Sequence, residues 1–232
     1  MENGLTSKIH SWFTHLTAII IFSLFIIPIS LILSLKWFNP PISSSMLGYE
    51  VSSNQNKISH EWKGWDEIAT SAPLAMIAAD NQLPAKRSGF NSQQLKQSLN
   101  NFIQDSQNTE SITRKTTKNL FLWPSKSSLG KGLETWLTLL METSLDKQRI
   151  LEIYMNIVEF SPGVFGIEAA SQRFFYKPAN DLTADESALL VAVLTDPNLY
   201  RTDSPSAFIE QRQRNIISQM DALDLCQSQY TC

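Results

Sequence analysis

The chain has 232 residues, 43% of them hydrophobic, and a formal net charge of −3 at pH 7. A chain of this length can bury one hydrophobic core and carry an appendage. The negative net charge provides no electrostatic footprint for DNA or RNA, so nucleic-acid binding is excluded.

The first feature in chain order is an uncharged apolar segment at residues 16–35. A helix of about 20 residues is long enough to cross a hydrocarbon layer of roughly 30 Å, and Trp12 and Trp37 stand where interfacial aromatic residues belong. The alternative is a cleaved signal peptide, whose apolar region would be shorter and followed by a small-x-small site. We therefore predict a transmembrane helix at residues 16–36.

Turn-forming residues follow this segment. Asn39-Pro40-Pro41 and the serine-rich residues 43–53 predict an extended linker over residues 37–57. A helix capped by Asp66 is then expected to end near Asp80, with a boundary or kink at Pro73. A second helix, capped by Asn91, and a polar loop at residues 104–117 follow.

The apolar residues 118–124 are edged by Lys118, Lys126 and Lys131. This pattern suits either a solvated basic face or a surface that rests on an anionic bilayer.

Two amphipathic segments with helical periodicity follow one another in residues 130–157. Leu133, Leu137 and Leu140 repeat at helical spacing in the first, and Ile150, Ile153, Tyr154 and Ile157 in the second. Both periods include residues that a core helix does not need: Lys131, Glu134, Arg149, Glu152 and Asn156. These residues form either ordinary surface pairs or part of a site.

The C-terminal part of the chain predicts two more helices. Thr183 and Glu186 form a capping box before an apolar run, and Ser204-Pro205 is expected to open the last helix. Apolar and polar residues do not alternate over any length, so the predicted fold class is all-α. Cys226 and Cys232 could close a small terminal loop in an oxidising compartment.

No Cys/His cluster has metal-ligand spacing, and all three histidines precede residue 61. A Ser-His or Cys-His hydrolase mechanism is therefore disfavoured.

Three segments together resemble glycosyltransferase family 51, most closely its monofunctional peptidoglycan transglycosylases. They are ILEIYMNIVEFSPGVFGIEAASQRFFYKP at residues 150–178, LTADESALLVAVL at 182–194, and KNLFLW at 118–123. The resemblance covers residues 58–221 and implies a lysozyme-like helical glycosyltransferase domain, which leaves residues 222–232 as a tail. It also implies a single-pass protein of the bacterial inner membrane, with residues 1–15 in the cytoplasm and the domain in the periplasm.

The family's reaction requires particular chemistry. The 4-hydroxyl of an acceptor disaccharide attacks the anomeric carbon of a growing chain, and undecaprenyl pyrophosphate leaves. A carboxylate must accept the hydroxyl proton. Cations or a metal ion must stabilise the charge that develops on the pyrophosphate. The implied partners are lipid II, the growing glycan chain, the membrane and other cell-wall synthesis proteins.

The resemblance assigns roles to ten residues. Asp80, where the family has glutamate, would be the general base, and Glu134 would assist the acceptor or hold a divalent cation such as Mg²⁺ or Mn²⁺. Arg114 and Lys115 replace paired glutamines of the family. The residues expected to bind the substrate or its pyrophosphate are Arg114, Lys115, Lys118, Asn119, Lys126 and Lys131. Glu152 and Asn156 would support the groove.

Three functions stay open from the sequence. The first is an active lipid II polymerase. The second is a membrane-tethered member that binds lipid II or partner proteins without turnover, because the substitutions cluster in the catalytic groove. The third is a lysozyme-like hydrolase with Glu134 as its acid.

Overall fold

The computed structural model of the chain describes residues 12, 17, 22, 26–52, 57–80, 111–122 and 128–229. Residues 26–34 are helical. The other α-helices are α2 (Ser44–Ser52), α3 (Ser71–Asp80), α5 (Ile112–Phe121), α6 (Ser128–Ser144), α7 (Lys147–Ile157), α8 (Ile167–Phe175), α9 (Ala184–Val193) and α10 (Ala207–Gln229). Two 3₁₀ turns and three strands complete the described part: η1 (Trp65–Glu67), η2 (Ala179–Asp181), β1 (Ser59–His60), β2 (Glu159–Ser161) and β3 (Val164–Phe165).

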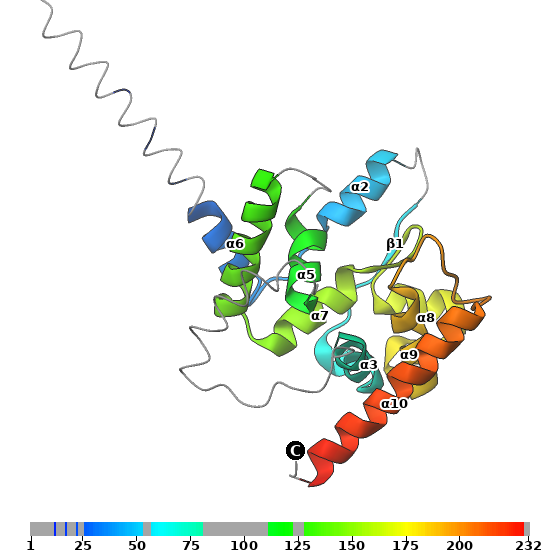
Figure 1. Cartoon of the computed structure of the whole chain (residues 1–232). Coiled ribbons are helices and arrows are strands. Elements are labelled where there is room, and N and C mark those ends of the chain that lie inside the picture. Colours follow the sequence, from blue (N-terminus) through cyan, green and yellow to red (C-terminus); the bar gives the residue numbers. More distant parts are fainter. Residues whose placement is uncertain are drawn as a thin grey trace, which may run out of the picture.

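Helix α7 lies at the centre of the molecule, between two groups of elements (Figure 1). On one side, Ile150, Ile153 and Ile157 pack with α2, α5, α6 and the end of helix 26–34. On the other side, Leu151 and Met155 pack with α3, α8, α9 and α10. The predicted burial of Ile150, Ile153, Tyr154 and Ile157 is confirmed, and α7 is buried on its other side as well.

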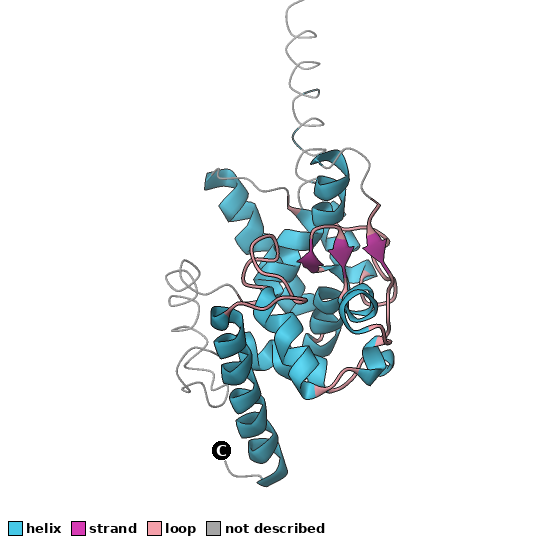
Figure 2. Cartoon of the chain, turned by 90° about the vertical axis from the view of Figure 1, so that its right-hand side faces the viewer, coloured by secondary structure: helices cyan, strands magenta, loops and turns pink. Residues whose placement is uncertain are grey.

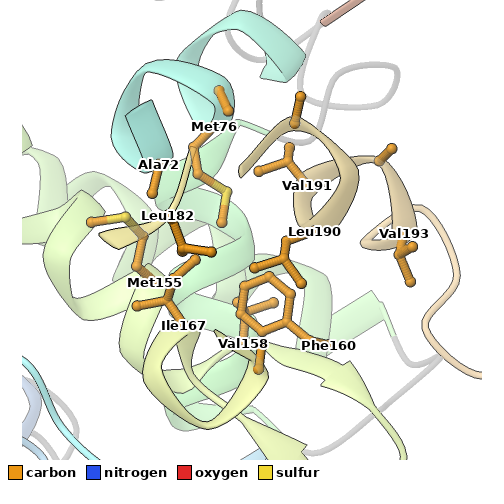
Figure 3. Packing of buried hydrophobic residues seen from close by; sticks show 14 of the residues in the cluster. Ala72, Met76, Met155, Val158, Phe160, Ile167, Leu182, Leu190, Val191 and Val193 are labelled. Carbon is orange, nitrogen blue, oxygen red and sulfur yellow. The ribbon is translucent and has the colours of Figure 1, made fainter. Parts of the chain in front are cut away.

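The second of these cores surrounds an aromatic side chain. Figure 3 shows side chains from α3, α7, α8 and α9 meeting around Leu182, Leu190 and Phe160. Phe160 and Leu190 are fully buried. This packing fixes the C-terminal end of α3, which carries Asp80.

A small sheet departs from the all-α prediction. Its strand order is β1-β3-β2, with β1 parallel and β2 antiparallel to β3 (Figure 2). Ser59 pairs with Val164, and His60 pairs with Phe165. Strands of two or three residues are too short for alternation to reveal them. The described chain is thus mostly helical, and the all-α prediction is wrong at this sheet.

The serine-rich linker is helical in the structure. Residues 44–52 form α2, whose Met46 is 2% exposed in the core. The Ser44 hydroxyl donates to the carbonyls of Asn119 and Leu122 at 3.1 and 3.0 Å. Because these acceptors lie at the end of α5, α2 is docked on the domain, and the prediction of an extended segment is wrong.

Other predicted boundaries shift by a few residues. Asp66 lies in η1, and α3 begins at Ser71. Pro73 is then the third residue of α3, where a missing N–H removes no bond within the helix. The last helix begins at Ala207 instead of Pro205. The Thr183–Glu186 capping box is confirmed.

The polar loop predicted at residues 104–117 is wrong at its C-terminal end, where α5 begins at Ile112. The predicted Asn91 helix, Lys126 and Cys232 lie outside the described residues, as do residues 16, 18–21 and 23–25 of the predicted membrane helix. Within the part of the chain that the structure describes, no helix is both long and apolar enough to span a bilayer.

Candidate active site

Asp80 is the last residue of α3 and faces the first turn of α5. Its Oδ2 accepts a hydrogen bond from the backbone N–H of Ile112 at 3.4 Å, and its Oδ1 lies 3.4 Å from Lys115 Nζ. A carboxylate at this place is favourable because the first N–H groups of a helix lack partners and carry partial positive charge. Helix α5 thus positions the predicted base.

Glu134, the second predicted acid, is held against the same turn of α5. Its Oε1 accepts a hydrogen bond from Arg114 Nε, and the Glu134 side chain is only 12% exposed. The Thr138 hydroxyl donates to the Glu134 carbonyl at 2.7 Å within α6. The acid is therefore partly buried and paired.

The two residues that replace the family's glutamines contact the two predicted acids. Arg114 and Lys115 are neighbours on α5, and the first reaches Glu134 while the second reaches Asp80. Ser111 begins this helix, and its hydroxyl accepts from the Arg114 N–H at 3.3 Å. The first turn of α5 therefore joins two carboxylates that are distant in sequence.

The other predicted substrate-binding residues lie farther along α5 or on α6. Lys118 and Asn119 lie in the last turns of α5, where the Ser44 hydroxyl donates to their carbonyls. Lys131 is exposed on α6. Binding of pyrophosphate by these residues stays a prediction.

Asn156 and Glu152, the predicted groove supports, hold neighbouring segments. Asn156 is fully buried; its Oδ1 accepts from the Lys63 N–H at 2.8 Å, and its Nδ2 donates to the Lys63 carbonyl at 2.9 Å. Glu152 pairs with Arg149 at 2.7 Å. The two Asn156 bonds fix the segment after β1 against α7, and the Glu152–Arg149 pair lies within α7.

Two charged residues of this scaffold had no role assigned from the sequence. Glu168, 3% exposed on α8, accepts from the Ala179 N–H at 2.8 Å and from Gln172 at 2.9 Å. Arg149 donates to the Leu35 carbonyl, just after helix 26–34. A charged residue in an apolar helix was the one feature of the sequence that could have indicated a role for it.

Burial shifts two titratable groups near α7. It lowers the pKa of His60 below its usual value, which the hydrogen bond to the Asn156 carbonyl partly opposes. It raises the pKa of Glu159 above its usual value, which the Gly163 N–H partly opposes. Neither group lies among the predicted catalytic residues.

A divalent cation does not fit Glu134 as the side chain is placed. The described residues contain no group of three or more His, Cys, Asp or Glu side chains that could hold a metal ion. The Glu134 carboxylate faces the guanidinium of Arg114, which would repel a second cation. A metal ion would bind here only after Arg114 moved away.

Two acids held by adjacent cations on one helix define a site suited to proton transfer and to binding an anionic leaving group. Comparison with known proteins agrees with this class. The profile described as transglycosylase matches residues 48–221, so the chain belongs to the transglycosylase family and is a glycosyltransferase.

Several named proteins are similar to this chain over most of their length. The biosynthetic peptidoglycan transglycosylase of Klebsiella oxytoca is 43% identical over 190 residues, which cover 80% of this chain and 78% of that protein. The protein of the same name from Shewanella oneidensis is 37% identical over 220 residues, 93% of each chain. That of Aeromonas hydrophila is 42% identical over 169 residues, 72% of each chain.

Proposed function

We propose that this transglycosylase polymerises peptidoglycan glycan strands from lipid II during cell-wall synthesis. The name shared by its relatives and the family profile support this proposal. The observation that carries it is the pairing of Asp80 with Lys115 and of Glu134 with Arg114 around the first turn of α5. That arrangement supplies both a base and cations for a pyrophosphate.

Each group has a step in the reaction. Asp80 accepts the proton of the acceptor 4-hydroxyl as the oxygen forms a bond to the anomeric carbon of the donor. The bond from that carbon to the pyrophosphate oxygen breaks, and the pyrophosphate leaves with its electron pair. Glu134 orients the acceptor. Cations stabilise the leaving group as its charge develops.

Substrate binding would release the two acids. Pyrophosphate is an anion that competes with Asp80 and Glu134 for Lys115 and Arg114, and a guanidinium can bind phosphate oxygens with two parallel hydrogen bonds. As the cations turn toward the leaving group, the carboxylates become available to the acceptor. Lys118, Asn119, Lys126 and Lys131 extend the same binding surface, while Glu152 and Asn156 support it.

We also propose that residues 16–36 anchor the chain in the bacterial inner membrane, with the domain on the periplasmic side. The uncharged sequence of residues 16–35 supports this placement, and so do the exposed side chains of Trp37 and Phe38 at the end of helix 26–34, which are 75% and 70% exposed. Extraction of membranes with alkaline carbonate should leave the chain in the pellet. N-terminal sequencing of the mature protein separates an anchor from a cleaved signal peptide.

Labelled lipid II tests the reaction. The detergent-solubilised wild type should form glycan polymer, and Asp80→Ala should form none, while Asp221→Ala, at an exposed position on α10, keeps wild-type activity. Parallel reactions with Mg²⁺, Mn²⁺ or a chelator show whether a divalent cation contributes. No polymer despite bound precursor would favour a binding-only member of the family. Release of fragments from preformed peptidoglycan would favour a hydrolase.

A further inference from the structure

Arg149 reaches out of α7 to the backbone at the end of helix 26–34. Its Nε donates to the Leu35 carbonyl at 2.8 Å, and its Nη2 donates to the Phe38 carbonyl at 3.1 Å. Nη2 also lies 2.7 Å from Oδ1 of Asn39. One guanidinium therefore contacts three residues of the segment that follows helix 26–34.

The contacted carbonyls lie just beyond the last turn of helix 26–34. The chain tightens after residue 34, because the Leu35 N–H bonds to Ile32 at 3.1 Å and the Phe38 N–H to Ser34 at 2.9 Å. The last carbonyls of a helix carry partial negative charge, and a cation there is stabilising. Arg149 thus places its positive charge near the C-terminal end of helix 26–34, from an element more than a hundred residues away in sequence.

The guanidinium is itself held in place from the other side. Its Nη1 donates to Glu152 at 2.7 Å, and its central carbon lies 5.6 Å from the ring centre of Trp62. The Arg149 side chain is 16% exposed, so water competes weakly for these bonds. A planar fork with fixed partners is a rigid connection, which a flexible lysine would not provide.

The same helix supports the candidate site. Helix α5, which carries Arg114 and Lys115, packs on α7. Ile32 and Leu35, at the end of helix 26–34, are buried in the core that α5 and α7 share. The position of helix 26–34 relative to the site therefore depends on α7 and on the contacts of Arg149.

We propose that Arg149 is a positioning residue that fixes the angle between the membrane-anchored helix and the catalytic domain. This inference rests on the proposed function, since it needs an anchor and a substrate held in the bilayer. A fixed angle sets the depth at which the first turn of α5 meets the pyrophosphate of a lipid-embedded substrate. A substrate free in solution does not need that angle.

Two substrates test this role with the full chain. In vesicles containing full-length lipid II, Arg149→Ala should polymerise at least about tenfold more slowly than the wild type, because small displacements of reacting groups cost large factors in rate. With a short-chain, water-soluble lipid II analogue in detergent, its kcat/KM should stay within about twofold of the wild type. Arg149→Lys should stay close to Arg149→Ala in vesicles, because a flexible ammonium does not replace the planar fork.

Control variants separate this role from a general loss of folding. Arg201→Ala removes an exposed arginine that pairs with Asp203 and should leave both activities unchanged. Asn39→Ala removes one bond of Arg149 outside α7 and should lower only the vesicle activity, to a smaller extent. Equal losses on both substrates, or no loss on either, would overturn the proposal.

A distance measurement tests the geometry without activity. After Cys226 and Cys232 are replaced by serine, spin labels at Ser30 and Thr135, both exposed, report the position of helix 26–34 relative to α6. Arg149→Ala should broaden the distance distribution, and Arg201→Ala should not. An unchanged distribution refutes the inference, even if the wild type proves inactive, which would instead refute the proposed reaction.

Discussion

Lys115 on α5 lies 3.4 Å from the carboxylate of Asp80, the residue that ends α3. Its neighbour Arg114 binds Glu134 in the same way. Both cations stand where the family's pattern has glutamine, which can hydrogen-bond an acid but cannot neutralise it. Each of the two cations that depart from the family's pattern is therefore paired with one of the predicted acids.

The Arg114–Glu134 pair should contribute to stability. Each of Arg114→Ala and Glu134→Ala should lower the free energy of unfolding by about 1–2 kcal/mol, between the values for exposed and fully buried pairs. The double variant should lose less than the sum of the two. Urea unfolding of the four proteins measures the coupling. A coupling no larger than that of the exposed Arg201–Asp203 pair would contradict the prediction.

The polymerisation rate should depend on both the charge and the length of the side chain at residue 80. Asp80→Asn should abolish polymerisation, because an amide cannot accept the proton, although it can still accept the Ile112 N–H. Asp80→Glu should raise turnover, because one methylene moves the carboxylate by about 1 Å toward the acceptor. Initial rates with lipid II measure both. If Asp80→Glu has only background activity, the limitation lies at Arg114 and Lys115 as well.

Two glycines should respond in opposite directions to alanine. Gly166 has φ of +84°, and a Cβ there would lie 2.7 Å from the Asn156 carbonyl oxygen. Gly166→Ala should therefore destabilise the fold by about 2 kcal/mol or more. Gly132 lies inside α6, and beyond its chain neighbours and the helix's own backbone no atom lies within 4 Å of an added Cβ. Gly132→Ala should stabilise by about 0.5–1 kcal/mol. Thermal unfolding of the two variants compares them directly.

The sequence predicted those elements whose signal is local. The repeats in α6 and α7 and the capping box at Thr183 need only neighbours a few residues away. Helix α2 could not be predicted in this way, because Ser44 finds its partners on α5, more than seventy residues later. The start of α5 was hidden by Thr116 and Thr117, whose type has low helix propensity.

The candidate site, too, could be predicted from the sequence only in part. Family motifs identified Asp80 and Glu134, but their pairing with Lys115 and Arg114 depends on how α3, α5 and α6 pack. The contacts of Arg149 with Leu35 also join distant segments. Residue types could be predicted from the sequence, whereas the partner of each charge is set by tertiary structure.

Asn156 should be the most sensitive of the supporting residues. It is fully buried and satisfies both the N–H and the carbonyl of Lys63. Asn156→Ala leaves these groups unpaired and should destabilise by about 2–3 kcal/mol. Asn156→Asp keeps the oxygen that accepts from the Lys63 N–H but replaces the Nδ2 donor with a second oxygen. That oxygen cannot donate to the Lys63 carbonyl, so this variant should not restore stability. If either variant has the same free energy of unfolding as the wild type, these bonds contribute little to stability.

Glu159 should make stability depend on pH. Burial raises its pKa in the folded state, so between the unfolded and folded pKa values the folded protein binds more protons than the unfolded chain. The free energy of unfolding then falls as pH rises through this window, and the penalty is complete above the folded pKa.

Glu159→Gln should remove that penalty. Glutamine does not titrate, and its side-chain oxygen can still accept the Gly163 N–H, which Glu159 binds at 3.1 Å. The variant should match the wild type at about pH 4 and exceed its stability at about pH 7, in paired denaturant titrations. Glu142→Gln, at an exposed position on α6, reports the general effect of removing one negative charge. If the two variants gain equally at neutral pH, net charge and not the burial of Glu159 accounts for the gain.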